Sequence, residues 1–377
     1  MSSARFLPVM LLAASTAFAQ VSRQTLSPVT NEDLRGVSAV TEQVAWVSGT
    51  HGTYLRTSDG GRTWLPGQVP GAEKLDFRGV VAFSADEAFL MSAGPGEQSR
   101  IYHTGDAGLH WQLQFTASNP KSFFDSIAFW DRTHGVALGD PVPDETGKLK
   151  FQVLLTQDGQ TWQAISAAQM PVALQGESAF AASNRCLALL NAEDSQIHSG
   201  AGIDSNLWFA TGGKSARVFH SADRGQTWGV FDTPIAHGPD SAGIFAIAFR
   251  DPWHGVIAGG DYKQPERDGP NLAFTKDGGK TWSLSQIFPQ SFYSAVAYDR
   301  GSLALSLANA KGGGDDNRAH IRLFVVSPKF VFDFRPPKDP TRVSPPKNSG
   351  VGFNAVSPFP KGGALLVGPK GSIVTLP

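Results

Sequence analysis

Cysteine is nearly absent from the 377 residues, because Cys186 is the only one. A disulfide within the chain and a two-cysteine zinc or redox site are therefore excluded. Charge is scarce too, since 17% of the residues are charged, against about 25% in average globular proteins. The 32 basic and 33 acidic side chains nearly cancel. The chain thus lacks the positive field that sequence-independent nucleic-acid binding requires.

Metal and cofactor signatures are missing as well. The nine histidines show no HxxxH or HxH spacing, the usual sign of a histidine metal site. Gly200–Gly202 precedes no helical pattern, and Gly312–Asp316 lacks the Lys-Ser/Thr pair of a phosphate loop. The sequence therefore predicts no metal and no cofactor.

Glycine and proline, in contrast, are abundant, with 41 and 25 residues. They interrupt the chain throughout, which favours many short strands joined by turns. The 41% of hydrophobic residues are enough for a folded core. No apolar segment reaches the roughly 20 residues of a transmembrane helix. The composition predicts an all-β protein with no membrane span.

The N-terminus has the pattern of a secretory signal peptide. Arg5 supplies the positive start, Phe6–Ala14 is a short apolar stretch, and Ala17–Ala19 is an A-x-A cleavage signal before Gln20. We therefore predict a signal peptide over 1–19, one domain over 20–377, and a location in the periplasm or outside the cell. The alternative interpretation is an apolar N-terminal strand.

One motif recurs five times, in the form Ser/Thr-x-Asp-x-Gly-x-Thr-Trp or close to it. Its aspartates and tryptophans, one pair in each copy, are Asp59 and Trp64, Asp106 and Trp111, Asp158 and Trp162, Asp223 and Trp228, and Asp277 and Trp282. An aspartate can accept backbone N–H groups of its own turn, and the following glycine can adopt a positive φ. The tryptophan can cover the turn. These residues are predicted to be structural, although a simple scan would take the aspartates for catalytic carboxylates.

Two apolar strands precede each motif, so each unit contains four strands, as a propeller blade does. Seven units can be counted, with six or eight as the alternatives. Their predicted starts are Leu34, Phe77, Phe124, Glu177, Gly243, Tyr293 and Gly352. The last unit lacks a fourth strand, which Ser22–Leu26 can supply to close the ring. The sequence predicts a single seven-bladed β-propeller of four-stranded antiparallel blades, closed by an N-terminal strand.

The recurring motif resembles the Asp-box (BNR) repeat of sialidases, xyloglucanase-type glycosidases, sortilin-like receptors and photosystem II stability/assembly factors. Matching turns at Asp131–Val136 and Asp251–Val256, with His134 and His254 in structural positions, are most similar to the assembly-factor group. A sialidase would carry a Phe-Arg-Ile-Pro segment, but Phe77-Arg78 is followed by Gly79-Val80. The resemblance implies a propeller and leaves the function open.

Strand order places the Asp-box turns on one face of the disc, and the longest loops on the other. These loops are Pro141–Lys150, Tyr262–Pro270, Ala310–Arg318 and the proline-rich Phe334–Ser349. Long loops on a rigid scaffold often bind ligands. A central pocket is expected on that face, ringed by the starts of the inner strands. Its predicted binding residues are Arg35, Arg78, Ser241, Ser294 and Asn354.

Four carboxylates are also expected near this pocket: Asp125, Asp140, Glu177 and Asp261. They could line a solvated rim, or two of them could act as the acid and base of a glycoside hydrolase. The leading hypothesis is an exported, non-catalytic binding or assembly-scaffold protein, monomeric, with a protein or glycan partner at the long-loop face. A carbohydrate-active hydrolase with a carboxylate pair in the pocket is the alternative.

Overall fold

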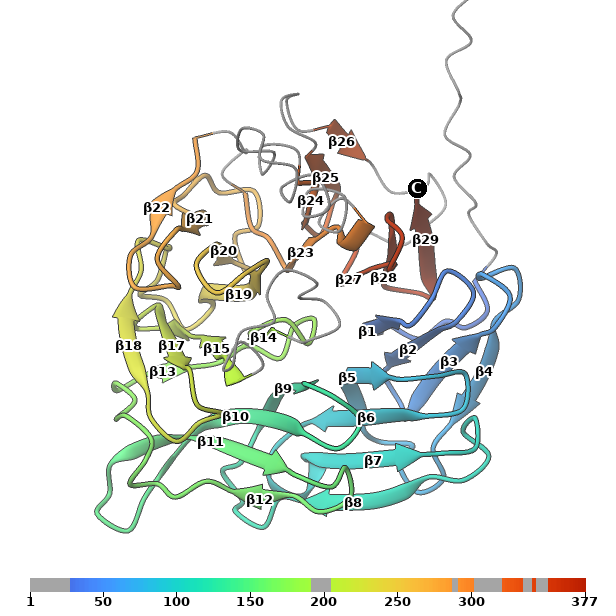
Figure 1. Cartoon of the computed structure of the whole chain (residues 1–377), viewed down its shortest axis with the longest axis horizontal. Coiled ribbons are helices and arrows are strands. Elements are labelled where there is room, and N and C mark those ends of the chain that lie inside the picture. Colours follow the sequence, from blue (N-terminus) through green and yellow to red (C-terminus); the bar gives the residue numbers. More distant parts are fainter. Residues whose placement is uncertain (1–27, 191–204, 287–290, 302–320, 335–340, 344–351) are drawn as a thin grey trace, which may run out of the picture.

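A computed structural model describes residues 28–190, 205–286, 291–301, 321–334, 341–343 and 352–377. The predicted signal peptide, the closing strand Ser22–Leu26 and the loop Ala310–Arg318 lie outside these residues. Seven sheets surround a central axis, as Figure 1 shows. The protein is an all-β, seven-bladed β-propeller, as the sequence predicts.

The first three blades are regular four-stranded antiparallel sheets. Blade one contains β1 (Leu34–Ala39), β2 (Ala45–Gly49), β3 (Thr53–Thr57) and β4 (Leu65–Gln68). Blade two contains β5 (Asp76–Ala82), β6 (Ala88–Ala93), β7 (Arg100–Thr104) and β8 (Gln112–Thr116), with the 3-10 helix η1 (Gly96–Gln98) between β6 and β7. Blade three contains β9 (Phe124–Phe129), β10 (Gly135–Pro143), β11 (Leu149–Thr156) and β12 (Gln163–Ala164).

Blades four and five are joined through two short strands. Blade four contains β14 (Leu187–Leu189), β15 (Leu207–Ala210), β17 (Arg217–Ser221) and β18 (Gly229–Asp232). Blade five contains β19 (Ala242–Phe249), β20 (Gly255–Asp261), β21 (Leu272–Thr275) and β22 (Ser283–Leu284). Two short strands, β13 (Glu177–Ser178) and β16 (Gly212–Gly213), are added at the inner edge of blade five. The sheet of blade five therefore has six strands.

The last two blades complete the ring. Blade six contains β23 (Ala295–Tyr298), β24 (Leu323–Val326), β25 (Val331–Phe334) and β26 (Thr341–Val343), and blade seven contains β27 (Ala355–Pro358), β28 (Ala364–Gly368) and β29 (Ser372–Leu376). Blades seven and one pack together: the Ala39 amide donates to Ser357 Oγ at 2.9 Å, and Gly371 N donates to Glu32 O at 2.8 Å. The proline-rich stretch Phe334–Ser349, predicted to be a long loop, includes an outer strand, β26.

One predicted blade start is wrong. Glu177 does not begin the inner strand of blade four; it pairs with Gly213 in the extra ladder beside blade five. The inner strand of blade four begins ten residues later, at Leu187. The ladder needs glycine, because a Cβ on Gly212 would lie 2.8 Å from the Gly243 Cα and 2.2 Å from Phe180 Cε2. The residues between this ladder and Leu187 therefore do not belong to the inner strand of blade four.

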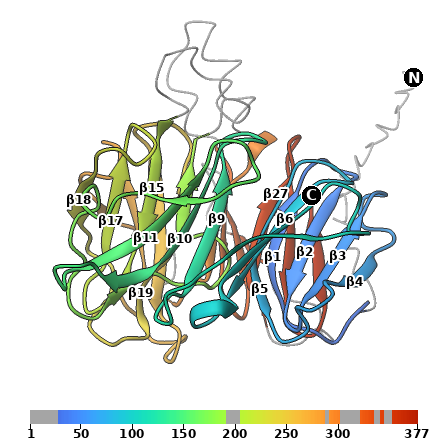
Figure 2. The same cartoon turned by 90° about the horizontal axis from the view of Figure 1, so that it is seen from below.

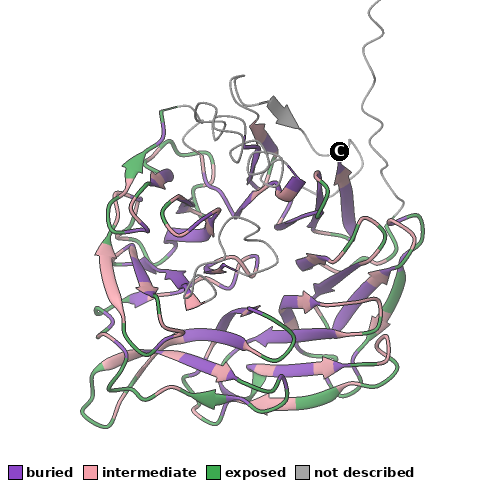
Figure 3. Ribbon diagram, in the orientation of Figure 1, coloured by how far each residue is buried: buried purple, intermediate pink, exposed green. Residues whose placement is uncertain are grey.

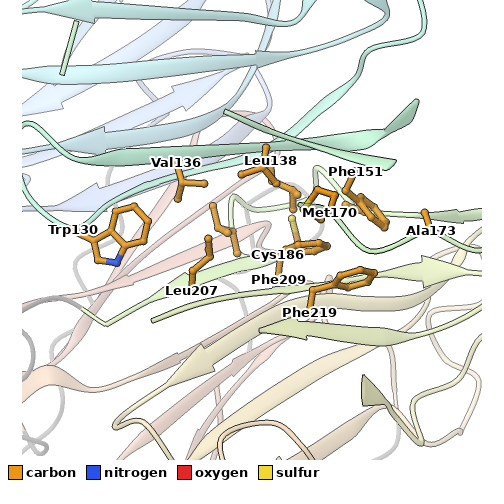
Figure 4. Close-up of a cluster of buried hydrophobic side chains, with 13 residues drawn as sticks. Trp130, Val136, Leu138, Phe151, Met170, Ala173, Cys186, Leu207, Phe209 and Phe219 are labelled. Atoms are coloured by element: carbon orange, nitrogen blue, oxygen red, sulfur yellow. The ribbon is translucent and has the colours of Figure 1, made fainter. Parts of the chain in front are cut away.

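Apolar side chains between neighbouring blades form the core. Figure 3 shows the inner strands buried and the outer strands more exposed. Figure 4 shows one cluster between blades three and four, in which Cys186 lies among Leu138, Phe151 and Phe209. Burial raises the pKa of the Cys186 thiol well above its usual value. The single cysteine is a core residue.

The Asp-box turns are held by one set of hydrogen bonds. In the first box, Asp59 Oδ1 accepts from the Thr63 amide at 3.0 Å and Oδ2 from the Thr63 hydroxyl at 2.6 Å, while the Gly61 amide donates to Thr57 Oγ1 at 2.9 Å. Gly61 has a φ of 80°. The boxes of Asp106, Asp158, Asp223 and Asp277 repeat the carboxylate bonds. These bonds lower the pKa of Asp59 and Asp106 to about 2.

Antiparallel pairing gives the disc two distinct faces (Figure 2). The Asp-box turns, together with the first-to-second-strand turns such as Asp131–Gly135, form the face that we name the Asp-box face. The second-to-third-strand loops and the crossings to the next blade form the opposite, long-loop face. Each inner strand therefore starts at the long-loop face and ends at the Asp-box face.

Candidate functional site

The segment Ala179–Cys186 crosses the central channel and binds the inner strands of several blades. The Ala179 amide donates to Asp140 Oδ1 at 2.9 Å, and Arg78 Nη1 donates to Ala181 O at 2.8 Å. Ser183 Oγ donates to Ser294 O at 2.8 Å. Arg78 and Ser294 lie near the starts of the inner strands β5 and β23, and Asp140 lies in the second half of β10, the second strand of its blade. The segment therefore fills the long-loop end of the channel, and we name it the plug.

The second half of the plug reaches deeper into the ring. Asn184 exchanges two hydrogen bonds with the backbone of Ile127, one to its amide at 2.7 Å and one to its carbonyl at 3.0 Å. Arg185 Nη2 donates to Val356 O at 2.6 Å, and Arg185 O accepts from the Ile247 amide at 2.8 Å. One segment thus links blades two, three, five, six and seven.

Two of the four predicted carboxylates come together under the plug. Asp125 is 1% exposed, and its Oδ2 has no hydrogen-bond partner among the described residues. Burial first, and then the charge of Asp140, raise the pKa of Asp125 well above its usual value, while Arg78 opposes the rise. Burial also raises the pKa of Asp140 to about 6, against the Ala179 hydrogen bond that lowers it. At low pH the two carboxyl groups are protonated, and neutral groups are compatible with a site that the plug covers.

The other two carboxylates have separate roles. Glu177 is buried and accepts from Arg217 Nε at 2.9 Å and Nη2 at 2.5 Å, and from the Thr211 hydroxyl at 2.7 Å. Asp261 ends β20 and accepts from the Lys263 amide at 3.0 Å, at the base of the loop Tyr262–Pro270. Among the described residues, no hydrogen bond or ion pair joins either of them to Asp125 or Asp140. Of the four candidates, the structure thus brings Asp125 and Asp140 together.

The predicted binding residues divide into exposed and buried ones. Arg35 and Arg78 are half-buried and flank Asp76, with Arg78 Nε at 2.8 Å and Arg35 Nε at 3.6 Å from its carboxylate. Asn354 Nδ2 donates to Leu34 O at 2.7 Å, which joins blade seven to blade one. Ser241 and Ser294 are buried. Of these five residues, the two arginines are the charged ones, and each keeps part of its side chain exposed.

Large apolar side chains are exposed on the outer part of the long-loop face. Val172 and Leu174 lie on the crossing from blade three, where Val172 O accepts from Arg217 Nη2 at 3.2 Å. Tyr262, in the loop after β20, is 49% exposed. The hairpin between β10 and β11 adds the exposed residues Glu145–Lys148. This face therefore offers apolar and charged groups to a partner.

The central cavity lies at the end opposite to the predicted one. It has a volume of about 320 Å³ and is lined by the second halves of the inner strands, toward the Asp-box face, with Ser183–Arg185 of the plug as its floor. Asp125 and Asp140 do not line it. The expected pocket at the inner-strand starts is wrong, because the plug occupies that place. Sequence reasoning missed the plug, since Ala179–Cys186 belongs to no repeat.

The described part of the chain has neither a cluster of metal-binding side chains nor a membrane-spanning helix. No group of three or more His, Cys, Asp or Glu side chains there is arranged to hold a metal ion. No helix within the same residues is long and apolar enough to cross a membrane.

Sequence comparison points to one group of propellers. The family description "Photosynthesis system II assembly factor YCF48" matches residues 16–119. The chain is 37% identical over 67 residues to photosystem II stability/assembly factor HCF136 of Oryza sativa subsp. japonica, and 36% identical over 66 residues to that of Arabidopsis thaliana. This chain is a distant relative of the YCF48/HCF136 assembly factors. The matched segment covers 17% of this chain and 15% of each of those two relatives.

Structural comparison extends the likeness over the ring. YCF48 bound to a D1 peptide aligns with a TM-score of 0.60 and 16% identity, over 94% of this chain and 96% of the other. YCF48 from Cyanidioschyzon merolae aligns at 0.56 and 16%, over 94% and 98%. A xyloglucanase from Xanthomonas campestris aligns at 0.57 and 12%, over 94% of this chain but 53% of the other. At these identities the likeness establishes the fold alone.

Proposed function

We propose that this protein is an exported, non-catalytic scaffold that binds a segment of a protein partner on its long-loop face. The observation that carries the proposal is the family match over residues 16–119, which include the first two blades, together with the 37% identity to HCF136 over 67 residues. A YCF48 has been observed with a D1 peptide bound, so a propeller of this group can hold a peptide. The partner of this chain is proposed by chemistry only, as a peptide with both apolar and charged side chains.

The binding surface follows from the geometry of the long-loop face. The plug fills the channel there, so a partner would lie across the outer loops. Val172, Leu174 and Tyr262 supply apolar contact, and Arg35 with Arg78 supplies positive charge beside Asp76. Exposed apolar side chains and charged groups on one face are features of protein-binding surfaces.

The buried carboxylate pair supports the absence of catalysis. A glycosidase needs its acid and its second carboxylate on either side of the scissile bond, in reach of a sugar. Asp125 is 1% exposed and Asp140 is bonded to the plug amide of Ala179. Neither lines the central cavity. A sugar could meet both groups only if the plug left the channel.

Photo-crosslinking in the host tests the face of binding. A benzophenone amino acid replaces Tyr262 on the long-loop face in one strain, and Trp253 on the Asp-box face in the other. The two side chains are 49% and 50% exposed, which makes them a matched pair. We expect a discrete crosslinked adduct, identified by mass spectrometry, from position 262 only. Adducts from 253 alone, or from neither position, contradict the proposal.

The same strains test export and catalysis. Mature protein from the periplasmic or culture fraction should begin at Gln20, and a full-length cytoplasmic protein contradicts export. Purified protein should not hydrolyse a panel of oligosaccharides and chromogenic glycosides. Turnover that is lost in Asp140→Asn, with a thermal melt no lower than that of the wild type, would establish the hydrolase instead.

A further inference from the structure

Two carboxyl groups are buried where the plug meets the strands of blade three. Asp125, in β9, is 1% exposed, and its Oδ2 has no hydrogen-bond partner among the described residues. Asp140, in β10, accepts from the Ala179 amide of the plug at 2.9 Å. Burial, and then the charge of Asp140, raise the pKa of Asp125, so the two groups interact. If both were ionised, two negative charges would lie near each other away from water, which is unfavourable.

The positive charge near this pair is limited and already shared. Arg78 is the cation that acts on Asp125 among the described residues. Its Nε also lies 2.8 Å from Asp76 Oδ2, and Arg35 Nε lies 3.6 Å from the other oxygen of that carboxylate. From the plug, Cys186 faces the pair, and burial raises the pKa of its thiol, so it stays neutral. Two guanidinium groups thus face three carboxyl groups.

The plug is attached to the same part of the ring. Arg78 Nη1 donates to Ala181 O at 2.8 Å. Ser126 and Ile127, which follow the buried carboxyl group in β9, donate to Asn184 Oδ1 from a hydroxyl at 3.1 Å and an amide at 2.7 Å. Plug residues therefore bond to the backbone and side chains on both sides of the pair. Water reaches both carboxyl groups most directly when the plug moves away.

We propose that the pair Asp125 and Asp140 is a pH-sensitive latch: in its protonated form it keeps the plug in the channel, and its ionisation releases the plug. The pKa of Asp140 is about 6 with the plug in place, against a usual value of 3.8. A carboxyl group that meets water after release returns toward its usual pKa. The preference for the closed form is therefore fully present below about pH 4 and is lost as pH rises through 6. The raised pKa of Asp125 extends this loss to higher pH.

Release of the plug would change which face of the disc reaches the cavity. Ser183–Arg185 of the plug form the floor of the cavity that lies toward the Asp-box face. Without this floor, the cavity would continue to the long-loop face. The latch thus makes access to the centre of the ring depend on pH. It is independent of the proposed partner surface, because that surface lies on the outer loops.

Hydrogen–deuterium exchange of the intact protein at pH 5 and pH 7.5 tests the latch, with each rate divided by the intrinsic rate at that pH. Peptides over 178–187 report the plug. Peptides over β2 (Ala45–Gly49), a buried strand with no hydrogen bond to the plug among the described residues, report opening of the whole propeller. We expect protection of the plug to fall by roughly tenfold or more relative to β2 at the higher pH, with the closed form still predominant. An equal change in the two regions, or no change, would overturn the proposal.

Neutral variants show whether the pair carries the effect. Asparagine keeps the size of aspartate, and its amide oxygen can still accept from the plug. The double variant Asp125→Asn with Asp140→Asn should keep the same protection of 178–187 at both pH values. Each single substitution should reduce the fall in protection, which keeps the test decisive if the double variant does not fold. Asp232→Asn, at the exposed end of β18, should keep the full wild-type fall. A wild-type fall in the double variant, or in both single variants, would contradict the latch.

Discussion

Arg78 joins the inner strand of blade two to a residue more than 100 positions later in the chain. Its Nη1 donates to Ala181 O at 2.8 Å while its Nε lies 2.8 Å from Asp76 Oδ2. One side chain thus fixes the plug and balances a carboxylate at the same time. The plug, in turn, decides which end of the channel stays open.

Loss of this contact should loosen the plug. In Arg78→Met the carbonyl of Ala181 and the carboxylate of Asp76 lose their donor, so we expect the free energy of unfolding to fall by about 1–3 kcal/mol. Urea denaturation measures it. Arg62→Met, which removes an exposed arginine from the first Asp box, should change stability by less than about 0.5 kcal/mol. Equal effects of the two substitutions would contradict the role of Arg78.

The pair Asp125 and Asp140 should make stability fall as pH rises. The pKa of Asp140 is about 6 in the folded protein and 3.8 as its usual value, so the folded state binds more protons between these values. The stabilisation that Asp140 gives by binding this proton is fully present below about pH 4 and is lost as pH rises through 6. We expect Asp140→Asn to gain stability over wild type across this range, by roughly 3 kcal/mol at most.

Urea midpoints of both proteins between pH 4 and 7 measure the effect. Burial lowers the pKa of His220 to about 4, which acts in the opposite direction. That residue is present in both proteins, so its contribution cancels in the comparison. Parallel pH profiles of wild type and Asp140→Asn would show that the pair does not titrate as described.

Removal of an Asp-box carboxylate should destabilise the propeller. Asp223 accepts from Ser221 Oγ at 2.7 Å, Thr227 N at 2.8 Å and Thr227 Oγ1 at 2.6 Å. Asp223→Ala should therefore lower stability by about 1–2 kcal/mol. A thermal melt measures it, with Asp232→Ala on the exposed end of β18 as the control. A melt of Asp223→Ala that matches the wild type would refute a structural role for the box.

The second box contains a strained residue. Ala107 has a φ of 65°, at the position where the first box has Gly60, with a φ of 76°. A left-handed conformation costs a residue with a Cβ roughly 1 kcal/mol, and glycine adopts it freely. Ala107→Gly should raise the melting temperature slightly or leave it unchanged, despite the greater entropy of the unfolded chain. A clear decrease would mean that the Ala107 methyl group makes a stabilising contact.

The repeats made the fold predictable from sequence. Each Asp box forms its hydrogen bonds between residues a few positions apart, as Asp59 and Thr63 do. The local sequence therefore determines its structure. The strand alternation around the boxes then gives seven blades. Glu177 was misplaced because an apolar run of Ala and Phe after it resembles an inner strand. Its true partner, Arg217, lies 40 residues away.

The site was less predictable because its contacts are distant in sequence. Ser183 meets Ser294 and Arg185 meets Val356, over separations of 111 and 171 residues. No local pattern marks such pairs. The convergence of Asp125 and Asp140 was foreseen as a possibility from strand order, but the segment that covers them was not. The cavity was therefore expected at the wrong end.

Hydrogen–deuterium exchange of the wild-type protein tests most directly whether the plug closes the long-loop end of the channel. The amides of Ala179 and Ile127 are bonded to Asp140 and Asn184, so peptides that cover 178–187 and 124–130 should exchange as slowly as other inner strands. The intrinsic exchange rate of an unstructured peptide of the same sequence supplies the fast reference. Exchange of 178–187 near that rate would show an open channel and would contradict the account.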